Sequence, residues 1–274
     1  MISFPNCKIN IGLHITAKRN DGYHNIETIM TPVQWCDGLE IVINSDTASE
    51  LEFKSSGIRF NSDKENNLCI KAYKLLAERF SLPPVKFHLH KIIPIGAGLG
   101  GGSSDSAFVL MMLNDLLNLK LTSIELEYFA AQLGSDCPFF IHNKTLFCYE
   151  RGDKFEKVHL KEKEYFIVLV KPKIHVNTIQ AYSWITPIER EQSIKKLFEQ
   201  PIEEWKSTIF NDFEPPVFER HPTIKNIKAR LYKQGALYAS MSGSGSTVFG
   251  IFNEEKHLTP YFRSATVFEG KIKL

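Results

Sequence analysis

The sequence lacks any long hydrophobic run: no stretch reaches about 18 apolar residues, roughly the length that a helix needs to cross a bilayer. The segment Met1 to Leu13 also lacks a basic region followed by an apolar core, which is the pattern of a secretory signal. We therefore expect a cytoplasmic protein that is neither secreted nor inserted into a membrane.

Cysteine is scarce and shows no pattern. The chain has five cysteines, with no Cys-x-x-Cys pair and no histidine cluster at the spacing of zinc ligands. We expect reduced, mostly buried thiols rather than a disulfide framework or a metal site. The cysteines are Cys7, Cys36, Cys69, Cys137 and Cys148.

An excess of charge of one sign is also missing, because 33 Lys and Arg residues stand against 31 Asp and Glu residues. A nearly neutral chain has no general attraction for nucleic acid or acidic membranes, so we expect neither as a partner and any anion site to be local. Hydrophobic residues make up 43% of the chain and charged residues 23%, as in ordinary globular proteins.

The length of 274 residues allows two compact domains. The charged stretch Glu150 to Glu164 has no clear periodicity, whereas the apolar run Tyr165 to Val170 is typical of a strand. We therefore predict one domain over residues 1–155 and a second over residues 156–274.

Several elements of the first predicted domain can be placed from periodicity. Residues Lys8 to Ile15 alternate between polar and apolar, which predicts a half-buried strand. The turn signal Asn20-Asp21-Gly22 then predicts a hairpin that carries Tyr23 and His24 beyond the bend. Further on, we predict strands at Leu39 to Ile43 and Val85 to Leu89, and helices at Asn66 to Phe80 and Ser103 to Leu117.

The next segments carry helix-boundary signals. Thr122-x-x-Glu125 has the form of a capping box, and the helix that it opens should end at Gly134. Asp136 then lies at the start of another helix. In the second domain, strands Ala236 to Met241 and Val248 to Phe252 flank a loop of small residues, Ser242 to Ser246.

The glycine-rich loop Pro94 to Ser104 follows a predicted strand and opens a predicted helix. Glycines let backbone amides approach phosphate oxygens at the positive end of the helix, so we predict a polyphosphate site. A flexible turn is the plainer alternative. Gly96-x-Gly98-x-x-Gly101 also matches a dinucleotide-binding fingerprint, but the strand that should follow its helix and end in an acidic residue is missing.

Neither of the commonest kinase signatures is present. The chain has no Gly-x-x-x-x-Gly-Lys-Ser/Thr motif, and it has no His-Arg-Asp or Asp-Phe-Gly motif. This excludes a P-loop NTPase and a protein kinase, so the predicted phosphate site needs a different fold.

Three segments together resemble the galactokinase, homoserine kinase, mevalonate kinase and phosphomevalonate kinase (GHMP) superfamily. They are Lys8 to Ile11 with Gly22-Tyr23-His24, Pro94 to Ala107, and Ser242 to Thr247. The resemblance implies an α+β fold with two lobes, an N-terminal ribosomal-protein-S5-like lobe and a C-terminal ferredoxin-like lobe, and a site that uses ATP with Mg²⁺.

The segments Gly134 to Phe140 and Asn211 to Glu214 resemble one branch of that superfamily, which phosphorylates a cytidine diphosphate derivative of methylerythritol. The resemblance implies that the γ-phosphoryl of ATP is transferred to the tertiary 2-hydroxyl, in the non-mevalonate route to isoprenoid precursors. Ser106, where the family commonly has Ala, and Cys7 are minor departures that remove no functional group.

Residue roles follow from the same resemblance. It implies that Asp136 is the catalytic base and that Lys8 pairs with it, although a helix cap and an exposed strand lysine are the structural alternatives. Asn10 would bind the substrate near the reacting hydroxyl. Tyr23 would stack on the cytosine and His24 would hydrogen-bond to its edge, with hairpin packing as the alternative for both.

Other assignments are looser. Tyr182 would supply a second aromatic face for the cytosine, and the loop that contains Gly243 and Ser244 would border the triphosphate unless it is a simple hairpin loop. Ser103 and Ser104 would contact phosphate or magnesium, with helix capping an equally good explanation. No protein ligand of a metal is assigned. The predicted ATP-binding residues are Pro94, Gly96, Ala97, Gly98, Leu99, Gly100, Gly101, Gly102, Ser103, Ser104, Gly243 and Ser244.

Two other functions stay open at this point. Another kinase of the superfamily, for homoserine or mevalonate, would share the glycine loop but would not need a cytosine pocket. An RNA-binding module is the non-enzymatic alternative, although basic and aromatic residues are not clustered into a nucleic-acid surface. The sequence predicts a small-molecule substrate and leaves the oligomeric state undetermined.

Overall fold

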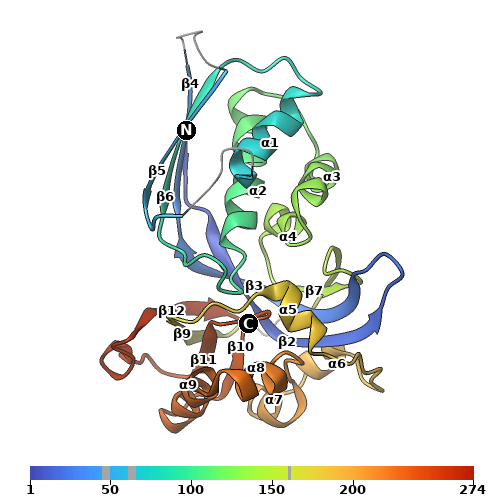
Figure 1. Ribbon diagram of the computed structural model, residues 1–274, viewed down its shortest axis with the longest axis vertical. Helices are drawn as coiled ribbons and strands as arrows, with labels where there is room; N and C mark the ends of the chain where they lie inside the picture. Colours follow the sequence, from blue (N-terminus) through green and yellow to red (C-terminus); the bar gives the residue numbers. More distant parts are fainter. Residues whose placement is uncertain (45–49, 61–65, 160–161) are drawn as a thin grey trace. The chain divides into compact units, whose positions relative to one another are not determined.

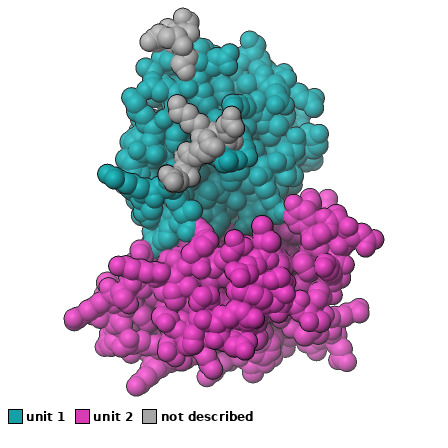
Figure 2. All heavy atoms as spheres, in the orientation of Figure 1, with its two compact units in different colours: residues 1–7, 35–95, 100–144 teal, residues 8–34, 96–99, 145–274 magenta. Residues whose placement is uncertain are grey.

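The computed structural model describes residues 1–44, 50–60, 66–159 and 162–274. These residues form two compact units, each built from helices and β-sheet (Figure 1). The first unit contains residues 1–7, 35–95 and 100–144, and the second contains residues 8–34, 96–99 and 145–274 (Figure 2). The units are defined by packing and interleave along the chain, and the division of the sequence at residue 155 stays a prediction. The α+β class is confirmed.

The first unit has one sheet with the strand order β1-β4-β6-β5. Its strands are β1 (Ile2–Ser3), β4 (Gly38–Ile43), β5 (Leu51–Gly57) and β6 (Val85–Lys91). Its helices are α1 (Leu68–Ala77), α2 (Gly101–Leu116), α3 (Ser123–Leu133) and α4 (Cys137–His142), which lie on one side of the sheet in Figure 1. The two strands and the helices predicted for this part of the chain are therefore confirmed.

Strict alternation along β6 builds the core of the first unit. Val85, Phe87 and Leu89 are buried and pack against residues of α1 and α2, whereas His88 and His90 are exposed on the other face. Both histidine rings hydrogen-bond to the Ser56 hydroxyl on β5, at 3.0 and 2.9 Å. The sheet therefore has one apolar face covered by helices and one polar face.

Local signals set the boundaries of α3 and α4. The Thr122 hydroxyl accepts from the Glu125 N–H and the Glu125 carboxylate accepts from the Thr122 N–H, so the predicted capping box is confirmed. Gly134 is the C-cap of α3, as predicted. Within the described ranges of the chain, no helix is both long and apolar enough to cross a membrane.

The second unit contains two four-stranded sheets, with the orders β2-β3-β7-β8 and β10-β11-β9-β12. The first consists of β2 (Asn6–Lys18), β3 (His24–Cys36), β7 (Leu146–Tyr149) and β8 (Lys154–Lys157). The second consists of β9 (Glu164–Pro172), β10 (Tyr238–Met241), β11 (Val248–Phe252) and β12 (Ala265–Lys273). The predicted hairpin at Asn20-Asp21-Gly22 joins β2 to β3, and the predicted strands before and after Ser242 to Ser246 are β10 and β11.

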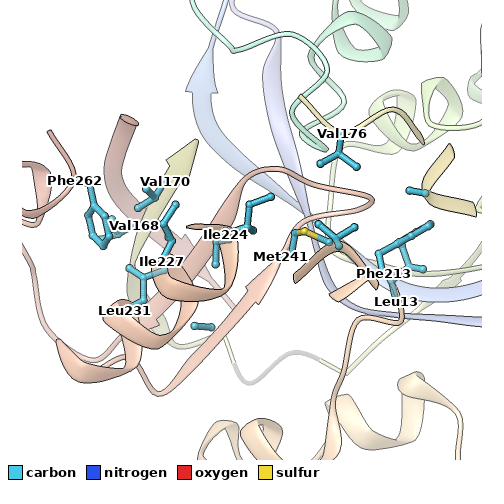
Figure 3. Packing of buried hydrophobic residues seen from close by; sticks show 14 of the residues in the cluster. Leu13, Val168, Val170, Val176, Phe213, Ile224, Ile227, Leu231, Met241 and Phe262 are labelled. Atoms are coloured by element: carbon cyan, nitrogen blue, oxygen red, sulfur yellow. The ribbon is translucent and has the colours of Figure 1, made fainter. Parts of the chain in front are cut away.

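Helices of the second unit are short. They are α5 (Thr178–Ser183), α6 (Ile194–Phe198), α7 (Ile202–Thr208), α8 (Glu214–Arg220) and α9 (Pro222–Lys233), with a 3₁₀ turn at Thr259–Tyr261. Figure 3 shows part of the core that they share with the strands: Ile224, Ile227 and Leu231 of α9 lie near Val168 and Val170 of β9. Phe213 and Met241 belong to the same cluster, together with Leu13 from β2.

The burial of β2 corrects one prediction. We expected a half-buried strand, but Lys8 is only 3% exposed and Asn10 only 1%, so the alternative of an exposed strand lysine is wrong. Segments distant in the sequence pack along the edge of this strand, where the Lys8 N–H donates to the Leu99 carbonyl and the Asn10 N–H donates to the Ser242 hydroxyl. Alternation identified the strand but gave no information about what packs on its polar side.

A buried ion cluster joins the two ends of the glycine loop within the first unit. Lys91, the last residue of β6, donates from Nζ to Asp37 Oδ2 at 2.5 Å and to Asp105 Oδ2, in the second turn of α2, at 2.6 Å. Asp37 Oδ1 also accepts from the N–H groups of Ile92 and Ile93, the first loop residues. All three charged side chains are at most 4% exposed. The cluster therefore fixes where the loop leaves the strand and where it enters the helix.

One cation shared by two carboxylates leaves this cluster with an excess of negative charge. Burial raises the pKa of Asp105 to about 7, although the Lys91 ammonium opposes the shift. Burial alone would lower the pKa of Lys91, but the Asp105 and Asp37 carboxylates outweigh it and the net shift is upward. Lys91 thus stays charged, and removing that charge would leave two buried carboxylates uncompensated.

We predict that Lys91→Met lowers the free energy of unfolding by about 3 to 5 kcal/mol, the cost of breaking a buried ion pair from one side. Lys271→Met is the control, because Lys271 pairs with Glu164 at 2.7 Å on the exposed surface. Urea unfolding of both variants measures the difference. Equal stability of the two variants would contradict a structural role for the Lys91 cluster.

Candidate active site

Strand β2 presents Lys8 and Asn10 side by side on its polar face. Lys8 Nζ donates to Asn10 Oδ1 at 2.5 Å, and Asn10 Nδ2 donates to the Thr28 hydroxyl on β3 at 3.1 Å. Thr28 in turn donates to the Gly12 carbonyl at 2.6 Å. This chain of hydrogen bonds limits the rotamers of the lysine, so its ammonium is held in one place before any ligand binds.

The central part of the glycine loop, Gly96 to Leu99, packs on β2 and on the loop between β10 and β11. The Leu99 carbonyl accepts from the Lys8 N–H at 2.9 Å, and the Gly98 carbonyl accepts from the Ser242 hydroxyl at 2.8 Å. The Ala97 carbonyl accepts from the Thr247 N–H at 3.2 Å. The structure therefore brings together parts of all three segments that resemble the superfamily.

These three contacts also orient the loop's amides. In a trans peptide the C=O and the following N–H point in opposite directions. Because the carbonyls of residues 97, 98 and 99 face protein donors, the N–H groups of Gly98, Leu99 and Gly100 face away from those donors. Adjacent N–H groups on one side of a loop are suited to binding an anion.

Gly98 is required by a close approach of two backbones. Its φ is +78°, in the left-handed region, and a Cβ at this position would overlap the carbonyl group of Ser242. The contact with the loop between β10 and β11 thus depends on the absence of a side chain.

Helix α2 begins directly after the loop. Its N-cap is Gly100, with φ +67° and no side-chain cap, and the first turn contains no acidic residue. Ser103 and Ser104 lie inside the helix, so the alternative that they cap it is wrong. The Ser104 side chain is 0% exposed and its hydroxyl has no hydrogen-bond partner among the described residues. The free N–H groups at this helix start favour an anion by themselves.

Asp136 occupies the N-cap position of α4, but its side chain makes no cap hydrogen bond. Its backbone angles, φ −83° and ψ −15°, are helical, unlike the extended conformation of an ordinary N-cap. The capping alternative therefore does not explain this carboxylate. Asp136 belongs to the first unit and Lys8 to the second, and their pairing stays a prediction.

The predicted cytidine residues form an aromatic stack, though in a different combination from the one expected. His24 lies face to face with Tyr182, with centroids 4.8 Å apart and an interplanar angle of 18°. Tyr23 is 54% exposed, and the Arg151 guanidinium lies 5.2 Å from its ring centroid. Burial lowers the pKa of His24, and the Lys18 charge adds to the shift, which favours the neutral imidazole.

Gly243 and Ser244 lie in the turn between β10 and β11. Ser244 Oγ is 2.9 Å from the Thr178 hydroxyl at the start of α5. The Gly243 carbonyl accepts from Asn211 Nδ2 at 2.9 Å. This loop is thus tied to two separate segments of the second unit and is more constrained than a simple hairpin turn.

Sequence reasoning missed three residues that organise this region. Ser242 connects β2 to the glycine loop, Thr28 holds Asn10, and Phe213 packs its edge against Tyr182 with centroids 4.9 Å apart. Ser242 and Phe213 stand in segments that carried the resemblance, so their positions were available as signals. Thr28 is one of several polar residues in β3 and gave no signal.

Two protein-family models and several named kinases match this chain. The family model described as "GHMP kinases N terminal domain" matches residues 67–144, and the one described as "GHMP kinases C terminal" matches residues 193–259. The 4-diphosphocytidyl-2-C-methyl-D-erythritol kinase of Bacteroides fragilis is 49% identical over 274 residues, covering 100% of both chains. The kinase of the same name from Cytophaga hutchinsonii is 52% identical over 256 residues, covering 92% of this chain and 93% of its own.

Solved structures agree with the sequence relatives. A crystal structure of 4-(cytidine 5'-diphospho)-2C-methyl-D-erythritol kinase is 28% identical, covers 100% of both chains and superposes with a TM-score of 0.83. The mevalonate kinase of Methanococcus jannaschii has a TM-score of 0.72 at 16% identity, over 100% of this chain and 98% of its own, which shows a shared fold alone. This chain belongs to the GHMP kinases, and among them to the 4-diphosphocytidyl-2-C-methyl-D-erythritol kinase family.

Proposed function

We propose that this enzyme transfers the γ-phosphoryl of ATP to the 2-hydroxyl of 4-diphosphocytidyl-2-C-methyl-D-erythritol, a step in the non-mevalonate route to isoprenoid precursors. Identity near 50% to kinases of that name over the full chain carries the proposal. The aromatic stack of His24 and Tyr182 supports a nucleobase substrate within the same chain.

The reaction needs positioning and charge neutralisation more than covalent chemistry from the protein. The substrate oxygen bonds to the γ-phosphorus, the bond from that phosphorus to the β–γ bridging oxygen breaks, and ADP leaves. In the proposed mechanism the hydroxyl proton passes to the Asp136 carboxylate. Lys8 holds its ammonium where negative charge develops, and its bond to Asn10 Oδ1 fixes that position.

The triphosphate of ATP is proposed to bind at the loop amides that follow Pro94 and at the start of α2. Support comes from the outward N–H groups of Gly98, Leu99 and Gly100 and from an N-cap that leaves the first helical amides available. Gly243 and Ser244 border the same loop through Ser242.

Magnesium is proposed as the cation bound with ATP, where it would neutralise charge on the phosphate oxygens. Over residues 1–44, 50–60, 66–159 and 162–274, no group of three or more His, Cys, Asp or Glu residues is arranged to hold a metal ion. A magnesium ion carried mainly by the phosphates needs only one or two protein oxygens. The unpartnered Ser104 hydroxyl is one oxygen that fits, and Ser103 in the same turn is a second candidate.

The proposed location is the cytoplasm, where ATP is available and thiols stay reduced. The described cysteines are all free, four of them buried. The proposed partner is the small cytidine diphosphate substrate, with no nucleic acid or membrane partner.

The proposed function is tested by ADP release with magnesium ATP and one acceptor at a time: the cytidine substrate, mevalonate or homoserine. We expect turnover only with the cytidine substrate, because a cytosine stack has no use in the other two reactions. A reaction without acceptor gives the background. Turnover with mevalonate or homoserine instead would retain the kinase fold and refute the assigned substrate.

Asp136→Asn should lower kcat by about 10² to 10⁴, the usual contribution of a general base, with little change in either KM. Asp115→Asn is the control, because Asp115 is exposed on α2. Steady-state kinetics of both folded variants give the result. If Asp136→Asn keeps the kcat of the wild type, Asp136 is not the base.

Gly98→Ala should raise the KM for ATP by about tenfold or more, because the new Cβ overlaps the Ser242 carbonyl and shifts the loop. Gly235→Ala is a matched control: its φ of +92° imposes a similar backbone penalty, but its Cβ would meet nothing within 4 Å. Both variants should lose about 1 to 2 kcal/mol from the left-handed backbone. An equal effect of the two substitutions on the KM for ATP would refute the role of the Gly98 contact.

A further inference from the structure

The segment Asn211 to Glu214 carried part of the family resemblance, yet the proposed chemistry gives it no role. It lies between α7 and α8 and runs alongside β2, where Leu13 and Asn211 form a parallel bridge. The Leu13 N–H donates to the Phe210 carbonyl, and the Asp212 N–H donates to the Leu13 carbonyl, both at 2.9 Å. Asn211 and Phe213 are each 1% exposed. A segment this buried next to β2 is placed to act on the site residues.

The side-chain amide of Asn211 forms three hydrogen bonds, all of them to backbone groups. Nδ2 donates to the Met241 carbonyl at 2.7 Å and to the Gly243 carbonyl at 2.9 Å, and Oδ1 accepts from the Phe213 N–H at 2.9 Å. Two donors and one acceptor on one short side chain are a combination that Asn supplies and that Asp, Ser or Leu does not. These three hydrogen bonds therefore require Asn at position 211.

The two carbonyls that Asn211 holds flank Ser242. The Ser242 hydroxyl donates to the Gly98 carbonyl in the glycine loop and accepts from the Asn10 N–H on β2. Glu214 holds the same strand end, since its Oε1 accepts from the Met241 N–H at 2.8 Å. Asn211 does not touch the glycine loop, but it sets the position of the residue that does.

Phe213 packs against one ring of the aromatic pair of His24 and Tyr182, the part of the proposed site that would bind the cytosine. Its ring meets the Tyr182 ring at nearly a right angle, at 4.9 Å and 85°, and Tyr182 also stacks on His24. Figure 3 shows Phe213 beside Leu13 and Met241, in the core cluster to which all three belong. Packing on that core fixes the edge that supports Tyr182.

Asp212 locks the segment in place. Its Oδ2 accepts from the Ile15 N–H at 2.7 Å and from Arg190 at 3.0 Å, and its Oδ1 accepts from Arg190 at 2.6 Å. A bidentate arginine pair together with a backbone hydrogen bond leaves little freedom for this carboxylate. The four residues thus form a rigid connection between two groups of site residues.

We propose that Asn211 to Glu214 is a positioning element with two separable outputs: Asn211 sets the loop that contacts the phosphates of ATP, and Phe213 sets the aromatic stack that contacts the cytosine. The inference rests on the proposed function, because it assigns one output to each substrate. A merely structural role for the segment predicts lower stability and no selective change in either KM.

Asn211→Asp keeps the shape and the acceptor but places an anionic oxygen against two carbonyls. The KM for ATP should rise about tenfold, with the KM for the cytidine substrate changed less than about twofold. Phe213→Leu should do the reverse, raising the KM for the cytidine substrate about fivefold through loss of the ring contact. Asn114→Asp is the control, since Asn114 also donates to a backbone carbonyl and accepts from a backbone N–H, both of Leu121, in the first unit.

Equilibrium binding of a non-hydrolysable ATP analogue and of cytidine diphosphate, by calorimetry, gives the same comparison without turnover. Selective weakening of one ligand by each variant supports the proposal. Unchanged affinities, or equal losses for both ligands, overturn it. If Asn211→Asp does not fold, Ser242→Ala tests the same link, and an unaltered affinity for the ATP analogue refutes it. Wild-type protein that binds both nucleotides without phosphorylating the cytidine substrate would refute the proposed function instead.

Discussion

Three consecutive carbonyls, those of residues 97, 98 and 99, are held by donors from β2 and from the loop between β10 and β11. The glycine loop would otherwise be the most mobile part of the site, because glycine loses more backbone entropy on folding than any other residue. Hydrogen bonds from segments that are themselves buried offset that cost and fix the peptide planes. The proposed binding of phosphates by the loop depends on this constraint, because it decides which way the amides face.

The same constraint explains why charged and polar residues are buried here. Lys8 and Asn10 are buried beside the contacts that hold the loop, and each has a hydrogen-bond partner. Burial without partners would cost about 1 to 3 kcal/mol for each neutral group and more for a charge. Lys91 and its two carboxylates repeat the pattern at the ends of the loop. These buried polar side chains thus lie beside the glycine loop, whose backbone has few apolar side chains to hold it in place.

The sequence predicted what is decided locally. The capping box at Thr122, the hairpin turn at Gly22 and the alternation along β6 depend on neighbours in the chain, and the structure confirms them. Strands β5 and β12 escaped prediction because they lie at sheet edges, where the hydrophobic alternation is weak. The covering of Lys8, the stack of His24 on Tyr182 and the Lys91 cluster depend on residues far apart in sequence, and no local pattern reports such contacts.

The fold does not by itself specify the acceptor, since mevalonate kinase shares it at 16% identity. In this chain the aromatic pair of His24 and Tyr182, which we propose to serve the acceptor, comes from a hairpin and a short helix. Neither element is rigid alone: α5 has six residues, well below the length of a stable isolated helix. The ring of Phe213, buried in the core, supplies the missing rigidity. An aromatic pair on short elements therefore needs support from the core, and that support comes from a segment that also holds the loop between β10 and β11 through Asn211.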